Sequence, residues 1–470
     1  MTSTFAMTIA GRAVRGAGDF EVLDPATGET LSLAPAASRE QLDEAMDAAL
    51  AAFRRWRADE PARRSALAAA AEAVESATYE LAKVLTQEQG KPLRESLAEV
   101  GTCATWLRYF AELELPREIV QDDEHALVEV VRRPLGVVAA ITPWNFPLAL
   151  AFWKIAPALR AGNTVVLKPS PFTPLTTLRL AELLRPLLPA GVLNVVSGGD
   201  ELGEWMSAHP VPRKISFTGS IATGKHVATS AATDLKRVTL ELGGNDPAIL
   251  LDDVDPVALA NRLFWGAFYN CGQVCAGIKR IYAPERLYDD VVASLAERAR
   301  SVKVANGMDD GVRVGPIATR PQFERVDDLV ADAVANGAHV AAGGAPLSLG
   351  GYFFAPTVLS GASDAMRIVA EEQFGPALPV IPYRDLDDAL EHANATQFGL
   401  GGSVWSADPR RAAAVAGELE TGTAWVNTHA VLAPHQPFGG RKWSGIGVEN
   451  GPWGLYGFTE LQVLHRARAT

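Results

Sequence analysis

The alternation of short apolar runs with helical segments between residues 126 and 251 constrains the fold of this chain most strongly. Continuous apolar runs bounded by turn residues lie at 137–141, 164–167, 193–196, 215–217 and 248–251. Helical patterns fill the intervals near 148–160, 174–186 and 224–231. Runs that are apolar throughout are typical of parallel strands buried on both faces. Their alternation with helices predicts an open α/β sheet with right-handed crossovers.

A second alternation follows Cys275, with helices expected near 286–303, 321–336, 386–395 and 409–419 and short strands near 278–283, 378–382 and 423–427. A chain of 470 residues exceeds what one hydrophobic core supports, so we interpret this half as a second α/β domain. The N-terminal part is expected to be helical over 38–56, 63–88 and 90–113. Strand-like alternation recurs at 126–131 and 458–465, and the latter could pair with a strand outside its own domain.

Composition excludes several classes of function. The chain carries 43 Lys and Arg against 55 Asp and Glu, a net charge of −12, without a long basic cluster. This balance gives no footprint for nucleic acid or for an anionic membrane surface. The apolar runs are too short to cross a bilayer, and the N-terminus lacks a signal-peptide pattern. Three cysteines cannot form a disulfide framework, so we expect a cytoplasmic protein without a metal cluster.

Cys275 is the candidate nucleophile. It lies in a segment of small residues, Gly272-Gln-Val-Cys-Ala-Gly277, where a thiol and a backbone N–H can approach the same substrate atom. The alternative is a small buried thiol, which is the ordinary role of a cysteine. We interpret Cys271 and Cys103 as structural, and leave open a protective disulfide between Cys271 and Cys275.

Two polar residues are expected at the carboxyl ends of strands, where open α/β sheets bind their ligands. Glu241 follows Val238 and Leu240 and precedes two glycines, which makes it a candidate general base; the alternative is a surface glutamate. Asn145 follows the run at 137–141 and is a candidate oxyanion donor; the alternative is ordinary turn chemistry beside proline.

The segment 217–226 predicts a strand, a glycine loop and a helix that could hold a phosphate at its N-terminus. It also suggests a rival class, because Gly219, Gly224 and Lys225 come within one residue of a P-loop. The run at 248–253 even ends in two aspartates, like a metal-binding strand of a nucleotide triphosphatase. We reject this rival because His226 cannot replace the Mg²⁺-binding hydroxyl and the cysteine segment would stay unexplained.

Taken together, these segments resemble the aldehyde dehydrogenase superfamily over nearly the whole chain, from Val22 onward. One such motif would be weak evidence, but seven occur in the family's order and at its spacing. They are Thr142-Pro-Trp-Asn-Phe-Pro147, Lys168-Pro-Ser170, Phe217-Thr-Gly-Ser220 with Gly224, Glu241-Leu-Gly-Gly244, Gly272-Gln-Val-Cys275, Glu371-Glu-Gln-Phe-Gly-Pro376 and Pro437-Phe-Gly-Gly-Arg-Lys-Trp-Ser-Gly445.

The resemblance implies a role for each matching residue. Cys275 would add to the aldehyde carbonyl, with Asn145 and the Cys275 N–H holding the oxyanion, and Glu241 would activate the water that hydrolyses the thioester. A carboxylate at this position argues against a relative that passes its acyl group to coenzyme A. The cofactor would be NAD or NADP, and the residues expected to bind it are Thr142, Trp144, Lys168, Ser170, Gly219, Ser220, Gly243, Glu372 and Phe374.

The resemblance also implies an architecture of two open, Rossmann-like α/β domains and a β oligomerisation arm. The cofactor domain would comprise 1–117 and 136–243, and the catalytic domain 244–437. The arm and C-terminal tail would comprise 118–135 and 438–470, which implies a homodimer or homotetramer.

The sequence departs from the family at one cofactor position. Many NAD-using members carry a glutamate three residues after the lysine, where this chain has Pro171. Its absence removes a group that would repel a 2′-phosphate, so we expect use of both cofactors with NAD slightly favoured. Lys168 and Ser170 could meet either cofactor.

The substrate follows from the residues expected to border the entry tunnel, namely Phe146, Trp153 and the loop 428–436, which includes Val431. That loop contains no Arg or Lys to hold a substrate carboxylate. We therefore expect an uncharged apolar aldehyde, aromatic or medium-chain aliphatic, with a semialdehyde as the alternative. A third hypothesis, an inactive protein of the same fold, is disfavoured because both Cys275 and Glu241 are present.

Overall fold

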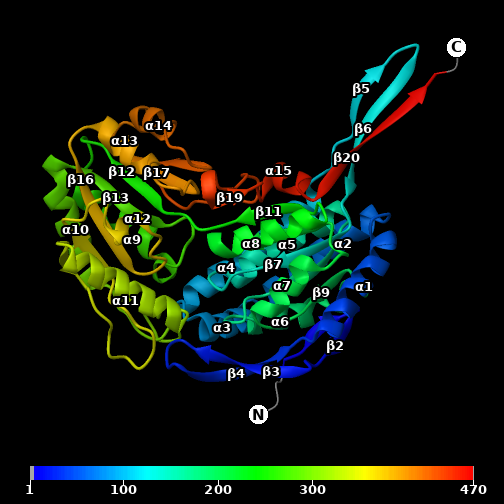
Figure 1. Ribbon diagram of the computed structural model, residues 1–470, viewed down its shortest axis with the longest axis horizontal. Helices are drawn as coiled ribbons and strands as arrows, with labels where there is room; N and C mark the ends of the chain where they lie inside the picture. The colour runs from blue at the N-terminus through cyan, green and yellow to red at the C-terminus, as the bar shows by residue number, and fades with distance from the viewer. Residues whose placement is uncertain (1–4, 469–470) are drawn as a thin grey trace.

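The computed structural model describes residues 5–468 and contains two large sheets, a three-stranded sheet and a hairpin (Figure 1). The first large sheet has eight strands in the order β19-β11-β10-β7-β8-β9-β1-β2. Strands β7 to β11 run parallel, while β1 and β19 pair antiparallel with β9 and β11. The strand bounds are β1 Met7–Ile9, β2 Arg12–Val14, β7 Val137–Ile141, β8 Thr164–Lys168, β9 Leu193–Val195, β10 Lys214–Thr218, β11 Arg237–Glu241 and β19 Gly445–Ile446.

Helices α1 (Arg39–Trp56), α5 (Pro147–Ala161), α6 (Leu175–Leu184) and α8 (Ile221–Thr233) pack against the strands of this sheet, and α7 (Asp200–Ala208) lies against α1 and α8. Helix α1 begins at a capping box, in which Ser38 accepts from the Gln41 N–H and the Gln41 side chain accepts from the Ser38 N–H. The parallel strands and their crossover helices confirm the predicted open α/β sheet.

The prediction of a single helix over 63–88 is wrong. Two helices, α2 (Glu60–Ser76) and α3 (Thr78–Gln89), occupy this region and are separated at Ala77. The hydroxyls of Ser76 and Thr78 donate to the carbonyls of Glu72 and Val74, and such side-chain bonds compete with the helical ladder. Helix α4 (Leu93–Glu112) then packs against α2 and α3.

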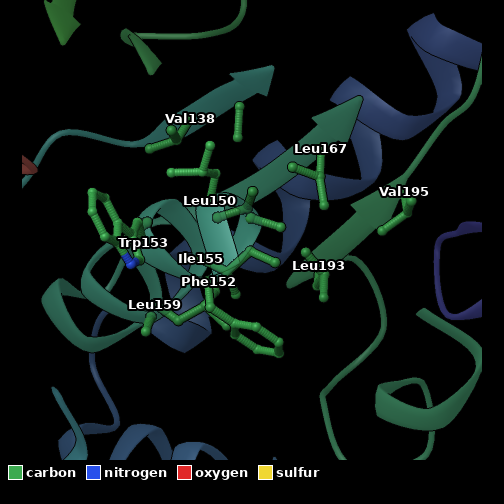
Figure 2. Close-up of a cluster of buried hydrophobic side chains, with 14 of the residues drawn as sticks. Val138, Leu150, Phe152, Trp153, Ile155, Leu159, Leu167, Leu193 and Val195 are labelled. Atoms are coloured by element: carbon green, nitrogen blue, oxygen red, sulfur yellow. The ribbon is translucent and has the colours of Figure 1, made fainter. Parts of the chain in front are cut away.

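Helix α5 is buried on nearly every face because it lies between the first sheet and the N-terminal helices (Figure 2). Phe152, Ile155 and Leu159 are each at most 1 % exposed and belong to the same apolar cluster as Val138 and Leu167 of the sheet. This burial of a helix that is apolar all round holds the end of β7 in a fixed position.

The second large sheet has seven strands in the order β14-β15-β16-β13-β12-β17-β18, all parallel to their neighbours except β14. The strand bounds are β12 Asp246–Leu250, β13 Ile278–Pro284, β14 His339–Ala342, β15 Thr357–Ser360, β16 Ala377–Tyr383, β17 Gly401–Trp405 and β18 Thr423–Val426. Its helices are α9 (Pro256–Phe268), α10 (Tyr288–Ser301), α11 (Arg320–Ala335), α12 (Arg367–Ala370), α13 (Leu386–Asn394) and α14 (Pro409–Ala416). This confirms the second α/β unit.

The three-stranded sheet projects from the body of the molecule (Figure 1). Its strands are β5 (Glu118–Asp122), β6 (Ala126–Pro134) and β20 (Thr459–Ala467), and β6 pairs antiparallel with both others. The two strand-like segments noted in the sequence therefore pair with each other. The short helix α15 (Gly451–Tyr456) lies between β19 and β20. A separate hairpin joins β3 (Gly18–Asp24) to β4 (Glu29–Ala36). The domain boundaries expected from the sequence stay a prediction.

Within residues 5–468, no helix combines the length and the apolar character that crossing a membrane requires.

The packing of α5 predicts that Phe152→Ala lowers the free energy of unfolding by about 3–5 kcal/mol, because it removes a buried ring and leaves a cavity. Chemical denaturation followed by circular dichroism measures this change. The matched control is Val257→Ala, at a helical position that is 74 % exposed, which is expected to change stability by less than about 0.5 kcal/mol. Equal effects of the two substitutions would contradict this account of the core.

Candidate active site

A cavity of about 530 Å³ lies at the point where the strand order of the first sheet reverses, between β7 and β10. Ligands of open α/β sheets bind outside the carboxyl ends of the strands at such a point. The second domain contributes the opposite wall of this cavity. The sequence-predicted residues on its walls are Trp144, Asn145, Gly219, Ser220, Gly243, Cys275, Glu372 and Phe374.

Cys275 is placed in the cavity wall by a tightly built turn after α9. Asn270 and Cys271 have φ of 50° and 56°, in the left-handed region, and Gly272 has φ of 74°. A Cβ at Gly272 would lie 2.2 Å from the Gly375 carbonyl, so a larger residue cannot occupy this position without movement. Cys275 is half-buried, whereas Cys271 is 1 % exposed. All three cysteines are free thiols, so the disulfide left open above is absent from the structure.

The Cys275 thiol lies among carboxylates. Burial, followed by the charges of Glu372, Glu241 and Asp246, raises its pKa to about 12. Burial likewise raises the pKa of Asp246 to about 8 and that of Glu372 to about 7. The thiol is therefore protonated at neutral pH in the chain without ligands, and nucleophilic attack requires removal of this proton.

Asn145 follows β7 and is held through both of its polar groups. Its side-chain Nδ2 donates to the Gln273 carbonyl over 3.0 Å, which leaves the second amide hydrogen free to serve a ligand. Its backbone carbonyl accepts from Lys91 Nζ at 2.7 Å and from Asn270 Nδ2 at 3.0 Å. The structure therefore brings Asn145 and Cys275 to one cavity, as the oxyanion hypothesis requires.

Glu241 ends β11, as expected, and its side chain is buried behind the cavity. Both of its carboxylate oxygens lack a hydrogen-bond partner among the residues that the structure describes. Burial raises the pKa of Glu241 well above its ordinary value; the charge of Glu449 raises it further, and that of Lys154 opposes the shift. Once ionised, a carboxylate with a raised pKa is a stronger base toward water than an ordinary glutamate.

Lys154 and Glu449 form a fully buried ion pair beside Glu241, with Nζ and Oε1 2.6 Å apart. Lys154 Nζ also donates to Thr218 Oγ1 at the end of β10, over 2.7 Å. Sequence reasoning missed this pair, although a lysine inside the apolar segment 147–161 is a signal that could have been noticed. Its partner stands 295 residues away and has no local pattern to reveal it.

On the side of the cavity where the cofactor is expected, the Glu372 carboxylate lies against Gly243 and Gly244. Glu372 Oε1 accepts from the Gly244 N–H at 3.3 Å, and a Cβ at Gly243 would lie 2.2 Å from Glu372 Oε2. Phe374 lies edge-on to Trp144, with ring centroids 5.3 Å apart. Gln322 and Arg325 of α11 donate to carbonyls of this segment; the sequence analysis missed both.

Three of the expected cofactor residues lie off the cavity wall but near the same strand ends. Lys168 ends β8 and is 4 % exposed; its Nζ reaches only the Pro169 carbonyl, at 3.4 Å, among the described residues. Burial lowers its pKa to about 8, with Asp200 opposing the shift. Thr142 is buried with an unpartnered hydroxyl, and Ser170 accepts from the Phe172 N–H. Ser220 is the N-cap of α8, whose positive end faces the cavity.

A second cavity, of about 510 Å³, lies on the other side of the cysteine segment. Its lining includes Trp265, Tyr269 and Val274, the last being next to Cys275 in the chain, and residues 428–430 of the expected tunnel loop. Arg262 of α9 also lines it, and sequence reasoning missed this charge because it lies far from the loop. The guanidinium donates to the Asn427 carbonyl and lies 5.0 Å from the ring centre of Trp405.

The three residues expected to bind substrate lie outside the walls of both cavities. Phe146 is half-buried and stacks on Tyr269 with centroids 6.3 Å apart, which places it beside the second cavity. Trp153 is 6 % exposed and packs between Trp106 and Phe438. Val431 is 53 % exposed, and its carbonyl accepts from Trp425 Nε1. Their role in substrate binding stays a prediction.

Comparison with known proteins identifies the group to which this arrangement belongs. The model of the aldehyde dehydrogenase family matches residues 13–464. The chain is 40 % identical to phenylacetaldehyde dehydrogenase of Pseudomonas fluorescens, over 97 % of this chain and 95 % of the relative. It is 39 % identical to 3-sulfolactaldehyde dehydrogenase of Pseudomonas putida, over 95 % and 93 % of the two chains. It is similar to the structure of the NAD⁺ complex of aldehyde dehydrogenase from Bacillus cereus, with a TM-score of 0.96, 35 % identity and coverage of 98 % and 96 %.

The raised thiol pKa predicts how Cys275 reacts with iodoacetamide in the cofactor-free protein. Only the thiolate is alkylated, so the rate constant should rise about tenfold per pH unit from neutral pH to beyond pH 9 without levelling. The rate is measured by quenching the alkylation at a series of times and quantifying the modified Cys275 by mass spectrometry. In the control variant Cys275→Ala no alkylation is expected, because Cys103 and Cys271 are each 1 % exposed. A plateau below about pH 8.5 would contradict the prediction.

Proposed function

The chain belongs to the aldehyde dehydrogenase family, and from this premise we propose that it oxidises an apolar aldehyde to its carboxylate with NAD or NADP. The reaction would pass through a thioester on Cys275 that water activated by Glu241 hydrolyses. The observation that carries this proposal is the pairing of two chemistries at one cavity. Cys275 and the amide donor Asn145 both line the wall, and Glu241, a buried carboxyl without a partner among the described residues, directly precedes Leu242 and Gly243 of the same wall.

The first half of the reaction belongs to Cys275 and Asn145. The thiol gives its proton to a water molecule, and its sulfur adds to the aldehyde carbon, which turns the carbonyl oxygen into an oxyanion. The free amide hydrogen of Asn145 Nδ2 and the Cys275 N–H stabilise that charge. The nicotinamide, when bound, accepts the hydride that leaves the tetrahedral carbon.

The second half belongs to Glu241. Its carboxylate takes a proton from a water molecule as the water attacks the thioester, and the Cys275 sulfur leaves as the carboxylate product forms. The charges of the neighbouring Lys154–Glu449 pair act on the pKa of Glu241: Glu449 raises it and Lys154 lowers it. Because no acyl acceptor other than water is required, the base supports hydrolysis rather than transfer to coenzyme A.

The residues present fit a dinucleotide cofactor. Lys168 is a buried ammonium that has no carboxylate within ion-pair distance among the described residues, so ribose hydroxyls or a phosphate can satisfy it. The N-terminus of α8 at Ser220 suits a pyrophosphate, and the Glu372 carboxylate suits ribose hydroxyls. Pro171 leaves no carboxylate to repel a 2′-phosphate, which supports dual use with NAD slightly favoured.

The second cavity supports an apolar aldehyde as substrate. Trp265, Tyr269, Val274 and Trp405 contribute apolar surface to its lining, beside the polar Asn261, Thr428 and His429. The charge of Arg262 is turned to the Asn427 carbonyl and the Trp405 ring. The relative named for phenylacetaldehyde acts on an aldehyde of this class. Arg262 also supports a second candidate, a semialdehyde or another anionic aldehyde, and one relative is named for 3-sulfolactaldehyde.

Assembly and compartment follow as further proposals. The three-stranded sheet exposes Ile119, Val120, Leu461 and Val463, each about 60 % exposed, which supports a homodimer or homotetramer formed through this arm. The three free thiols support a reducing compartment such as the cytoplasm.

The test of this function is the initial rate of reduced-nicotinamide formation without coenzyme A. NAD and NADP are each paired with phenylacetaldehyde, benzaldehyde, hexanal and succinic semialdehyde, and Cys275→Ala is the blank. We expect turnover of the three apolar aldehydes that vanishes in the blank. A faster rate with succinic semialdehyde would overturn the apolar assignment and favour the Arg262 alternative. No turnover of any pair would overturn the proposed function.

Glu241→Gln separates the two halves of the reaction. The substitution keeps the shape of the side chain but removes the base, so hydride transfer should persist while thioester hydrolysis slows. Rapid mixing is expected to give one burst of reduced nicotinamide per active site, followed by a steady rate at least about 100-fold below that of the unmodified enzyme. A burst lost together with the steady rate would contradict the role assigned to Glu241.

A further inference from the structure

We propose that Lys91 is a positioning residue for the oxyanion donor Asn145, acting through the Asn145 backbone carbonyl. Lys91 lies in the turn between α3 and α4, in a segment that the motifs and the reaction leave without a role. The proposal rests on the proposed function, because it assigns Lys91 a part in stabilising the oxyanion that forms on Cys275.

The Lys91 ammonium is fixed by three groups at once. Its Nζ donates to Glu99 Oε2 at 2.6 Å and to the Asn145 carbonyl at 2.7 Å, and it lies 4.1 Å from the ring centre of Phe146. The side chains of Lys91 and Glu99 are 0 % and 1 % exposed. Moving this buried ammonium away from its partners would leave a charge unpaired inside the protein, which is costly. Lys91 therefore holds the Asn145 carbonyl in one position.

The same ion pair fixes the chain that follows Asn145. Glu99 Oε1 accepts from the N–H groups of Leu148 and Ala149, at 3.0 and 3.1 Å. These are the first free N–H groups of α5, which has no side-chain cap of its own. Lys91 therefore binds the turn at Asn145, and Glu99 binds it where the turn enters α5.

The turn is also joined to the cysteine segment of the other domain. Asn270 Nδ2 donates to both the Asn145 and the Gln273 carbonyls, at 3.0 and 3.1 Å. Asn145 Nδ2 donates to the same Gln273 carbonyl. Gln273 stands two residues before Cys275, so this network sets the oxyanion donor relative to the nucleophile. Lys91 supplies its one charged contact to Asn145 among the described residues.

Removal of the pair should therefore displace the amide donor rather than the thiol. An error of about 1 Å in a catalytic group costs about 100-fold in rate. Loss of one oxyanion donor costs about 100- to 1000-fold. The rate loss caused by removing Lys91 should be smaller than the loss caused by removing the Asn145 side chain. It should also appear only in proteins that retain Asn145.

A double-mutant cycle tests this dependence. Lys91→Met alone would leave the Glu99 charge buried and unpaired, so the perturbing variant is Lys91→Met with Glu99→Gln, which removes both charges and keeps both shapes. The measurement is the rate constant of reduced-nicotinamide formation in the first turnover with phenylacetaldehyde and NAD, called the burst rate constant below. We expect a fall of about 10- to 100-fold when Asn145 is present, and of less than about threefold in the Asn145→Ala background.

Two further measurements exclude a general structural effect. Alkylation of Cys275 by iodoacetamide forms no oxyanion, so its rate should change by less than about twofold in the Lys91→Met, Glu99→Gln variant. The matched control is Glu88→Gln, which alters a buried carboxylate in the adjacent turn that caps α6 through the N–H groups of Leu175 and Thr176. Its burst rate constant should stay within about twofold of the unmodified enzyme.

Three outcomes overturn the inference: equal losses with and without Asn145, a parallel loss of alkylation, or an unchanged burst in the double variant. Failure of the proposed function itself has a different signature. In that case the unmodified enzyme forms no reduced nicotinamide in either the first or later turnovers, so the Asn145 and Lys91 variants have no rate to lose.

Discussion

The register of three parallel strands in the first sheet decides where the chemistry lies. Strand β10 pairs with β7 and β11 so that Phe217 stands opposite Ile141, and Thr218 stands opposite Glu241. The three strands therefore end at one level, and the segments that follow open onto one edge. Asn145, Ser220 and Glu241 reach a single site because of this register. A slip of one residue would send every side chain of a strand to the opposite face.

Burial of charge is the second constraint on the site. Water exclusion strengthens the hydrogen bonds that stabilise an oxyanion, but it also raises the cost of every ionised group. The buried ionisable groups of the site fall into two kinds. Groups that hold the frame are paired, as in Lys91–Glu99 and Lys154–Glu449. Groups that react, such as Cys275 and Glu241, stay unpaired and have raised pKa values. Burial thus disfavours the charged forms of the reacting groups, whereas the paired groups keep their charges and fix the geometry.

Much of the fold could be predicted from the sequence because its signals are local. Apolar runs such as 137–141 mark buried strands, and a capping box at Ser38 marks the start of α1. Cys275, Glu241 and Asn145 could be predicted as site residues because each lies in a short motif beside a strand or a turn. The break at Ala77 escaped prediction because two hydroxyls that bond to the backbone look like ordinary helix residues. The contacts of Lys91 with Asn145, of Lys154 with Glu449 and of Arg262 with Asn427 escaped because they join residues 54 to 295 positions apart, which only the folded chain brings together.

The central claim is that the acyl group of the substrate is carried by Cys275. It is tested most directly by peptide mass spectrometry of the Glu241→Gln variant, quenched in acid after mixing with phenylacetaldehyde and NAD. The account predicts a phenylacetyl group on the peptide that contains Cys275, located on that residue by fragmentation and absent without NAD. An unmodified Cys275 after a burst of reduced nicotinamide, or an acyl group on Cys271, would contradict it.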